Sequence, residues 1–338
     1  MVSEWPIAAE AADPPVEAAR VRGGSRLATV RRDFLLDPAE RLTEQERALM
    51  TAMLHDLVGT LATEIAAAAN GQATSLPEPA ELAARLNQAG LLDRAELVAL
   101  LLRRADEHRI AAALSGRLGP RRLPLLPMLV ADPNPDIAAA AMALVVARGR
   151  RRDTFGQPRV ELSDLAAEDV PVLVNAVAAA IAGEGGSTAM AIAAATLVDR
   201  YNAADSLDSA VAALAEALDQ AGRAEEGLIE NAAEEGEAAL LAYLLARRAS
   251  IDPSIAWDHL IGARGGRLGL LAKMAGLGRQ AAARLFAELG GLAGPFALEV
   301  EIGEFDRLTD EAVQSALAWW RLPETFRSAR EALDWAHG

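Results

Sequence analysis

The chain has 338 residues, of which 52% are hydrophobic but only 4% aromatic, and its formal net charge is −15. This composition provides ample apolar surface for a core built mainly from Ala, Leu and Val, and Ala has the highest intrinsic helix propensity. Because the chain has no cysteine, disulfides, thiolate nucleophiles and cysteine-based metal sites are excluded. The negative charge disfavours general binding to nucleic acid or to anionic membranes, since like charges repel.

Residues 1–25 are predicted to form a disordered N-terminal arm, because Pro and Gly interrupt them and large apolar side chains are few. The arm has no basic region of the kind that begins a secretory signal. The longest apolar stretches, residues 170–181 and 190–198, are shorter than the roughly 20 residues that a membrane span needs. We therefore expect a cytoplasmic protein that does not bind the membrane.

From Thr43 onward, apolar residues recur at helical spacing. A first strong helix is predicted near Thr43, and short helices separated by Gly, Pro and Asp turns follow as far as about residue 290. We expect separate helices after Asp93 and from Glu107 to Leu118. Short one-sided helices are stable only when they stack. The sequence thus predicts essentially no sheet and a helix content above about 60%.

One segment resembles a unit of a HEAT repeat. The turn at residues 132–136 precedes an Ala-rich helix that runs to Ala147, with Asp136 as its predicted N-cap and Leu144 as a predicted core residue. We expect an all-α fold of the HEAT-like helical-repeat type, an α-solenoid, with an irregular helical bundle as the alternative. The predicted regions are the N-terminal arm 1–25, an N-terminal helical region 26–89, a repeat domain 90–290 and C-terminal capping helices 291–338.

Several stretches between residues 90 and 290, about 60% of the chain, resemble domain-of-unknown-function family 2336, a bacterial family. The resemblance implies a helical-repeat fold. It implies no activity, because that family has no catalytic residues to carry over to this chain. The stretches that carry it are Leu102-Arg-Arg-Ala-Asp-Glu-His108, Leu129-Val-Ala-Asp-Pro-Asn-Pro-Asp136, Ala242-Tyr-Leu-Leu-Ala-Arg-Arg-Ala249 and Leu268-Gly-Leu-Leu-Ala-Lys-Met-Ala-Gly-Leu277.

The sequence offers no convincing catalytic site. Its four histidines do not follow metal-ligand spacing, and no three or four ligands are grouped as a zinc site requires. The Gly-rich stretches at 183–188 and 262–269 are interpreted as connecting loops. The first lacks the setting of a phosphate-binding loop, whereas the second contains Arg264 and Arg267, so that anion binding is its alternative. We therefore expect no catalytic residue, no metal and no cofactor. A helical-repeat glycosylase type of enzyme is the third hypothesis for function.

The clearest local chemistry is a run of arginines in the middle of the chain. Residues 101–160 hold eleven Arg against five acids, whereas residues 205–237 hold ten acids and one Arg. Such a run is typical of a solvated helix C-terminus, where cations complement the helix dipole, or of a site for phosphate, nucleic acid or an acidic protein. The candidate anion- or partner-binding residues are Arg103, Arg104, Arg121, Arg122, Arg148, Arg150, Arg151 and Arg152.

A second candidate site is the aromatic pair Trp319 and Trp320 near the C-terminus. The pair is typical of a buried capping helix, and the alternative is an exposed anchor for a partner. The first hypothesis for function is a non-catalytic protein-interaction or scaffolding module, with a protein partner whose identity the sequence does not specify. The second is a nucleic-acid or anionic-ligand binder that uses the arginine-rich middle region.

Overall fold

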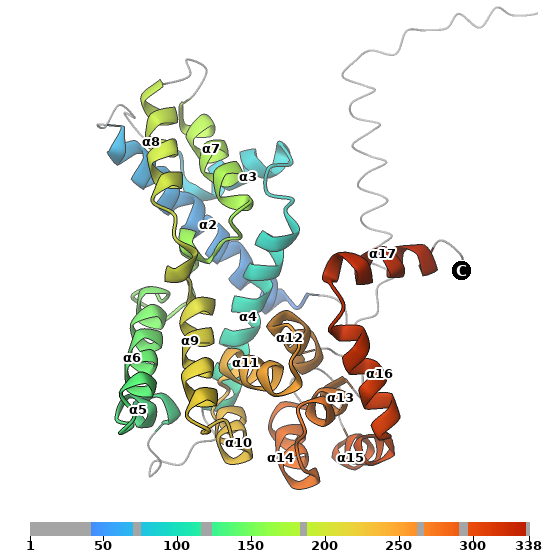
Figure 1. Cartoon of the computed structure of the whole chain (residues 1–338). Coiled ribbons are helices and arrows are strands. Elements are labelled where there is room, and N and C mark those ends of the chain that lie inside the picture. The colour runs from blue at the N-terminus through green and yellow to red at the C-terminus, as the bar shows by residue number, and fades with distance from the viewer. Residues whose placement is uncertain are drawn as a thin grey trace, which may run out of the picture. The chain divides into compact units, whose positions relative to one another are not determined.

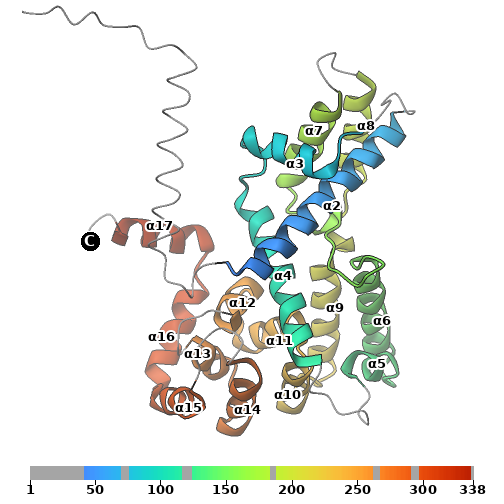
Figure 2. The same ribbon diagram turned by 180° about the vertical axis from the view of Figure 1, so that it is seen from behind.

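The computed structural model is all-helical (Figures 1 and 2). It describes residues 42–69, 76–115, 124–182, 188–261, 267–290 and 297–335. Of these described residues 78% are helical, and none belongs to a β-strand. One isolated antiparallel bridge joins Arg152 and Pro158. The predictions of an all-α fold and of a high helix content are therefore confirmed. The predicted N-terminal arm, 1–25, lies outside the described residues.

Residues from Glu44 onward form one compact unit. Two short 3₁₀ turns, η2 (Leu162–Asp164) and η4 (Ala203–Asp205), lie between its helices. In the described part of the chain, the α-helices are α2 (Glu44–Ala68), α3 (Pro79–Gln88), α4 (Ala95–Ser115), α5 (Leu125–Val130), α6 (Pro135–Arg150), α7 (Asp169–Ala182), α8 (Thr188–Asp199), α9 (Leu207–Gln220), α10 (Glu226–Glu234), α11 (Ala238–Ala249), α12 (Pro253–Ile261), α13 (Arg267–Met274), α14 (Arg279–Leu289), α15 (Leu298–Arg307), α16 (Asp310–Trp320) and α17 (Glu324–Trp335).

Helix α6 illustrates how local sequence determines these elements. Pro135 occupies its first turn, where the missing N–H costs nothing. The side chain of Asn134 accepts a hydrogen bond from the N–H of Asp136 at 2.9 Å, so Asn134 is the N-cap. The prediction that Asp136 caps this helix is wrong; its charge instead complements the helix dipole from the first turn. Leu144 is fully buried, as predicted.

Helix α4 is longer than the sequence indicated. The helix expected after Asp93 and the helix expected from Glu107 are one continuous helix, Ala95–Ser115. Neither Pro nor Gly occurs between these two residues, so nothing in the local sequence ends the helix. As a result, α4 is long enough to take part in two separate cores.

The helices enclose two clusters of buried apolar side chains. The first core is formed by α2, α3, α7, α8 and the N-terminal half of α4. The second core is formed by the C-terminal half of α4 together with α5, α6 and α9 to α16. Ala105 belongs to the first core and Ile110 to the second, so α4 crosses from one to the other. Both views show α2, α3, α7 and α8 grouped together, away from α5, α6 and α9 to α14 (Figures 1 and 2).

Each of the two cores combines helices from two of the predicted regions. Helices α2 and α3, expected in the separate region 26–89, share the first core with α7 and α8. Phe305, Val313 and Leu317, expected in the capping region 291–338, belong to the second core. The chain leaves the second core after α6, adds α7 and α8 to the first, and returns at α9. The crossing segments, 151–168 and 200–206, lie with α4 at the junction of the two cores.

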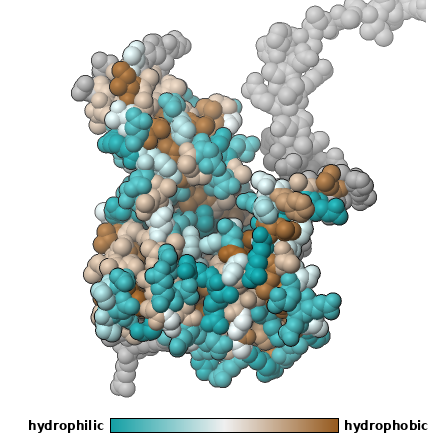
Figure 3. Space-filling view, viewed as in Figure 1, coloured by the Kyte–Doolittle hydropathy of each residue, from teal (hydrophilic) through white to brown (hydrophobic). Residues whose placement is uncertain are grey.

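The surface of the unit is mixed in polarity. Figure 3 shows hydrophilic residues interspersed with hydrophobic ones on the face seen in Figure 1, and hydrophobic atoms appear along α17 and where it joins α16. In α17 the side chains of Phe326 and Leu333 are exposed. Among the described helices, none combines the length and the apolar character that crossing a membrane requires.

Candidate binding site at the junction of the two cores

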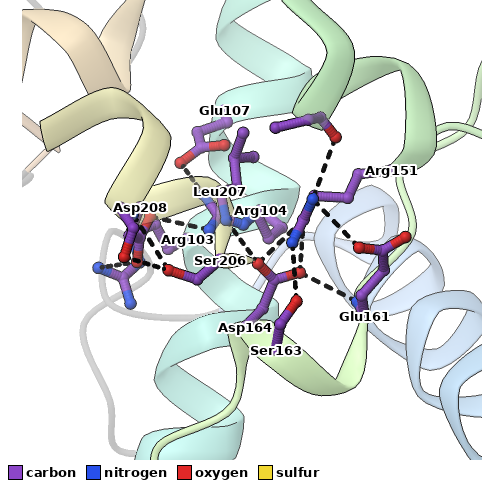
Figure 4. Close-up of polar contacts among 12 residues, drawn as sticks. Arg103, Arg104, Glu107, Arg151, Glu161, Ser163, Asp164, Ser206, Leu207 and Asp208 are labelled. Atoms are coloured by element: carbon purple, nitrogen blue, oxygen red, sulfur yellow. Dashed lines mark hydrogen bonds and ion pairs between the residues drawn. The ribbon is translucent and has the colours of Figure 1, made fainter. Parts of the chain in front are cut away.

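A network of charged side chains fills the junction of the two cores (Figure 4). Arg104, a buried residue of α4, donates hydrogen bonds to Glu107 at 2.7 Å and to Asp208 at 2.8 Å. Arg103 forms an ion pair of 3.3 Å with the other oxygen of Asp208. Because Asp208 lies in the first turn of α9, these contacts tie α4 to the beginning of that helix.

Arg151 is the other buried arginine of the network (Figure 4). Its Nε donates to the carboxylate of Asp164 at 2.7 Å. Both terminal nitrogens of Arg151 also lie close to oxygens of the chain. Arg151 was a candidate anion-binding residue, but oxygens of the chain surround its guanidinium group. These oxygens are Ala147 O at 3.1 Å, Glu161 Oε2 at 3.2 Å, Ser163 Oγ at 3.1 Å and Asp205 O at 2.9 Å.

Asp164 holds the segment between α6 and α7 against α9. Its carboxylate accepts hydrogen bonds from the backbone N–H groups of Glu161 at 2.9 Å and Leu207 at 2.8 Å, in addition to Arg151. The side chain of Asp164 is completely buried. On this side of the junction the charged side chains therefore stabilise the fold.

Each buried charge of the network has a partner of opposite sign. Burial raises the pKa of Glu107 above its usual value, while Arg104 opposes that shift. Burial would also raise the pKa of Asp208, but Arg104 and Arg103 outweigh it and hold that pKa below its usual value. A buried charge left without its partner is strongly destabilising, so these pairs depend on one another.

Beside this network, a pocket of about 130 Å³ is bordered by α4, α6, the beginning of α11 and residues 152–159. Arg148 donates to both carboxylate oxygens of Glu237, at 2.9 and 2.5 Å. Arg152 is exposed and forms no ion pair with any described residue. Of the arginines around this pocket, Arg152 is thus the one with its charge unmatched by an internal carboxylate. Those arginines are Arg104, Arg148, Arg151, Arg152 and Arg159.

One wall of the pocket is a short hairpin at residues 151–159. The N–H of Asp153 donates to the carbonyl of Gln157 at 3.0 Å, and its carboxylate accepts from the N–H groups of Phe155 and Gln157, each at 2.8 Å. Gly156 has a φ of +78°, a conformation that favours glycine. The conformation of the hairpin tip is therefore fixed by its own hydrogen bonds.

Phe155 lies at that tip and is 87% exposed, the highest exposure among the large hydrophobic side chains of the described residues. Burying apolar surface contributes about 25 cal/mol per Å². The exposed ring thus retains a hydrophobic driving force that the fold does not use. Phe155 was not among the predicted site residues. The signal that could have identified it is an aromatic residue in the polar turn Asp153 to Gly156, without large apolar neighbours.

The structure separates the other candidate arginines. Arg121 and Arg122 lie outside the described residues. Arg150 is exposed and lines a different hollow, together with Arg159 and Arg200. Arg103 and Arg104 are paired with carboxylates in the junction, as described above. The arginines of the run at 148–152 therefore lie at different sites.

Trp319 and Trp320 are both half-buried. The ring of Trp320 packs edge-on against that of His259, with 5.0 Å between ring centroids, and lies against the second core. Trp320 thereby secures α16 to α12. The packing of Trp320 agrees with a capping helix, and an anchor role for the half-exposed Trp319 stays a prediction.

His108 also lines the pocket, and burial together with the charge of Arg152 lowers its pKa. Within the described ranges, no three His, Asp or Glu side chains converge as metal ligands do. Comparisons with family models, with curated proteins and with solved structures found no match for this chain. The resemblance to domain-of-unknown-function family 2336 stays a prediction.

Proposed function

We propose that this protein is a non-catalytic protein-interaction module whose hairpin inserts Phe155 into a partner protein. The observation that carries this proposal is the exposure of Phe155, 87%, on a tip that hydrogen bonds hold in one conformation. Aromatic residues and arginines dominate the energetics of protein interfaces. An anchor that is already rigid loses little conformational entropy on binding.

The charges beside the hairpin indicate the chemistry of the partner. Arg150 and Arg152 are exposed, and neither forms an ion pair within the described residues. Charge complementarity steers association and selects partners. The proposed partner surface is an apolar pocket that accepts a phenyl ring and has carboxylates at its rim.

Single-stranded nucleic acid is the second candidate, because an exposed aromatic ring beside arginines also suits base stacking. Such sites generally use several aromatic residues along a basic groove. In this sequence Phe155 is the only aromatic residue between positions 35 and 200, and the net charge of −15 repels a phosphate backbone. These two facts favour a protein partner.

The proposal includes a HEAT-like stacking of helices in the second core. The successive contacts of α6 with α9, α9 with α11, α11 with α12 and α12 with α13 support this arrangement. An irregular bundle is the alternative, because α7 and α8 interrupt the series between α6 and α9. The absence of cysteine suits the reducing conditions of the cytoplasm.

The test is capture of a partner by the tagged full-length chain, in the parent and in two variants. Phe155→Ala removes the proposed anchor, whereas Phe326→Ala removes a ring of 55% exposure from α17 as a matched control. We expect one protein to co-purify with the parent and with Phe326→Ala but not with Phe155→Ala. Retention in Phe155→Ala, or loss in Phe326→Ala alone, would move the interface away from the hairpin.

Nucleic acid is tested separately by fluorescence anisotropy with a mixed-sequence duplex and a single strand at two salt concentrations. We expect no binding tighter than about micromolar at physiological salt. Typical non-specific nucleic-acid binding has a Kd of about 10⁻⁴ to 10⁻⁶ M, so tighter binding would indicate a dedicated site. Tighter binding that is lost in both Phe155→Ala and Arg152→Gln would make nucleic acid the ligand of the hairpin.

A further inference from the structure

We propose that the arginine-lined pocket beside the hairpin binds a phosphate group, in addition to the protein contact assigned to Phe155. The pocket brings together side chains from α4 and α6 with the beginning of α11. Three features of the pocket support phosphate binding: its free hydrogen-bond donors, the helix end that borders it and its volume.

Two arginines supply free donors. Arg152 is exposed without an ion-pair partner among the described residues, so its whole guanidinium fork is available. Arg148 uses two of its five N–H donors on Glu237, which leaves three. Guanidinium groups bind phosphate through two parallel hydrogen bonds. His108 lines the same pocket from α4 and adds a ring nitrogen.

The beginning of α11 is an independent contribution. Residues 236–239, which include the N-cap and the first two residues of this helix, line the pocket. The helix has twelve residues, and no side chain caps its first N–H groups. Uncapped N–H groups at a helix N-terminus carry the positive end of the helix dipole and bind phosphate. Cationic side chains and helix N–H groups therefore meet in one pocket.

The two carboxylates of the pocket are already neutralised. Glu107 accepts from Arg104, and Glu237 is held at both oxygens by Arg148. An incoming anion therefore meets the unmatched charge of Arg152 and not a free carboxylate. The contact of Glu237 also shows that this wall accommodates an oxyanion in two-point contact.

The volume limits what the pocket holds. Sites for drug-sized ligands and cofactors have volumes of about 300–1,000 Å³. At about 130 Å³ the pocket is too small for a whole nucleotide. It suits a phosphate group, either as the free ion or as the end of a larger molecule that extends into solvent. Phosphate offers three or four oxygens to these donors, whereas a carboxylate offers two.

The experiment is isothermal titration calorimetry of the full-length chain with inorganic phosphate and, separately, with phosphoserine. We expect saturable binding of at least one probe. Arg152→Gln should weaken it at least about tenfold, and Arg152→Lys should weaken it less, because lysine keeps the charge but loses the fork. Arg150→Gln is the matched control, since Arg150 is equally unpaired but lines another hollow. Its effect should stay within about twofold, as expected for a screened surface charge.

Two results would overturn the proposal: no saturable binding of either probe tighter than about 10 mM, or equal weakening by Arg150→Gln and Arg152→Gln. Tighter binding of inorganic phosphate would identify the free ion as the source, and tighter binding of phosphoserine a phosphorylated molecule. Phe155→Ala should leave phosphate affinity unchanged. The calorimetry can therefore contradict the phosphate site without contradicting the proposed protein contact of Phe155, and the capture experiment can do the reverse.

Discussion

Two sides of the same junction use arginine in opposite ways. On the buried side, between α4, η2 and α9, Arg104 and Arg151 are surrounded by carboxylates and carbonyls of the chain. On the hairpin side, Arg150 and Arg152 are exposed and unmatched within the described residues. Neither residue type nor position in the run decides the role of an arginine. What decides is whether the fold brings an acceptor to it.

The largest expected effect is on the buried side. Asp164→Ala leaves Arg151 buried without its main carboxylate and also removes the acceptor of Leu207 N–H. Breaking a buried pair in this way costs about 3–5 kcal/mol of unfolding free energy. Urea denaturation measures it. Arg152→Ala on the hairpin side is the control and should change stability by less than about 0.5 kcal/mol. Similar losses from the two variants would abolish the distinction between the sides.

A somewhat smaller effect is expected beneath the arginine run. Leu144 of α6 is completely buried in the second core, whereas its neighbour Met142 is 48% exposed. Leu144→Ala should cost about 2–5 kcal/mol, because the cavity relaxes only in part. Thermal unfolding of both alanine variants checks this, and Met142→Ala should stay close to the parent. An unchanged Tm for Leu144→Ala would contradict the packing of α6.

Asp106 of α4 tests what happens where a buried carboxyl is poorly compensated. Burial raises its pKa to about 6, with Arg109 opposing and Glu46 reinforcing that shift. A carboxyl whose pKa is raised by folding holds its proton more tightly in the folded state. Its contribution to stability is therefore present below the unfolded pKa, 3.8, and is lost as the pH rises through about 6.

Asp106→Asn removes the ionisable group while keeping its shape. We expect the variant to be more stable than the parent at pH 8 by about 1 kcal/mol and no more stable at pH 4, since the shift disfavours the charged form. Urea denaturation at both pH values provides the comparison. A variant that is less stable than the parent at pH 8 would show that the ion pair with Arg109 outweighs burial.

The smallest effect on stability is expected at the hairpin tip. Phe155→Ala should leave the unfolding free energy within about 0.5 kcal/mol of the parent, because the ring is almost fully exposed and the tip is held by backbone contacts of Asp153. Thermal unfolding measures it. A clear loss of Tm would mean that the ring packs within the chain and is not an anchor held ready for a partner.

Helix content and the burial of Leu144 were predictable because they follow from local apolar spacing. The N-cap of α6 was less predictable, because Asn134 and Asp136 are both good N-cap residues. Pro135 occupies the first helical position, which makes Asn134 the N-cap. The division into two cores was not predictable. Helices α2 and α8 meet in the first core although α5 and α6, which belong to the second core, lie between them in the chain.

The arginine run itself was visible in the sequence, and so was its positive charge. Its division was not, because the acceptors come from distant positions: Asp208 is 104 residues from Arg104, and Glu237 is 89 residues from Arg148. Arg151 and Arg152 are neighbours in the chain, and only packing of η2 and α9 against α6 buries the first and leaves the second free. Local sequence specifies which residues are charged, whereas tertiary structure specifies which charges are neutralised, because ion pairing acts through distance in space.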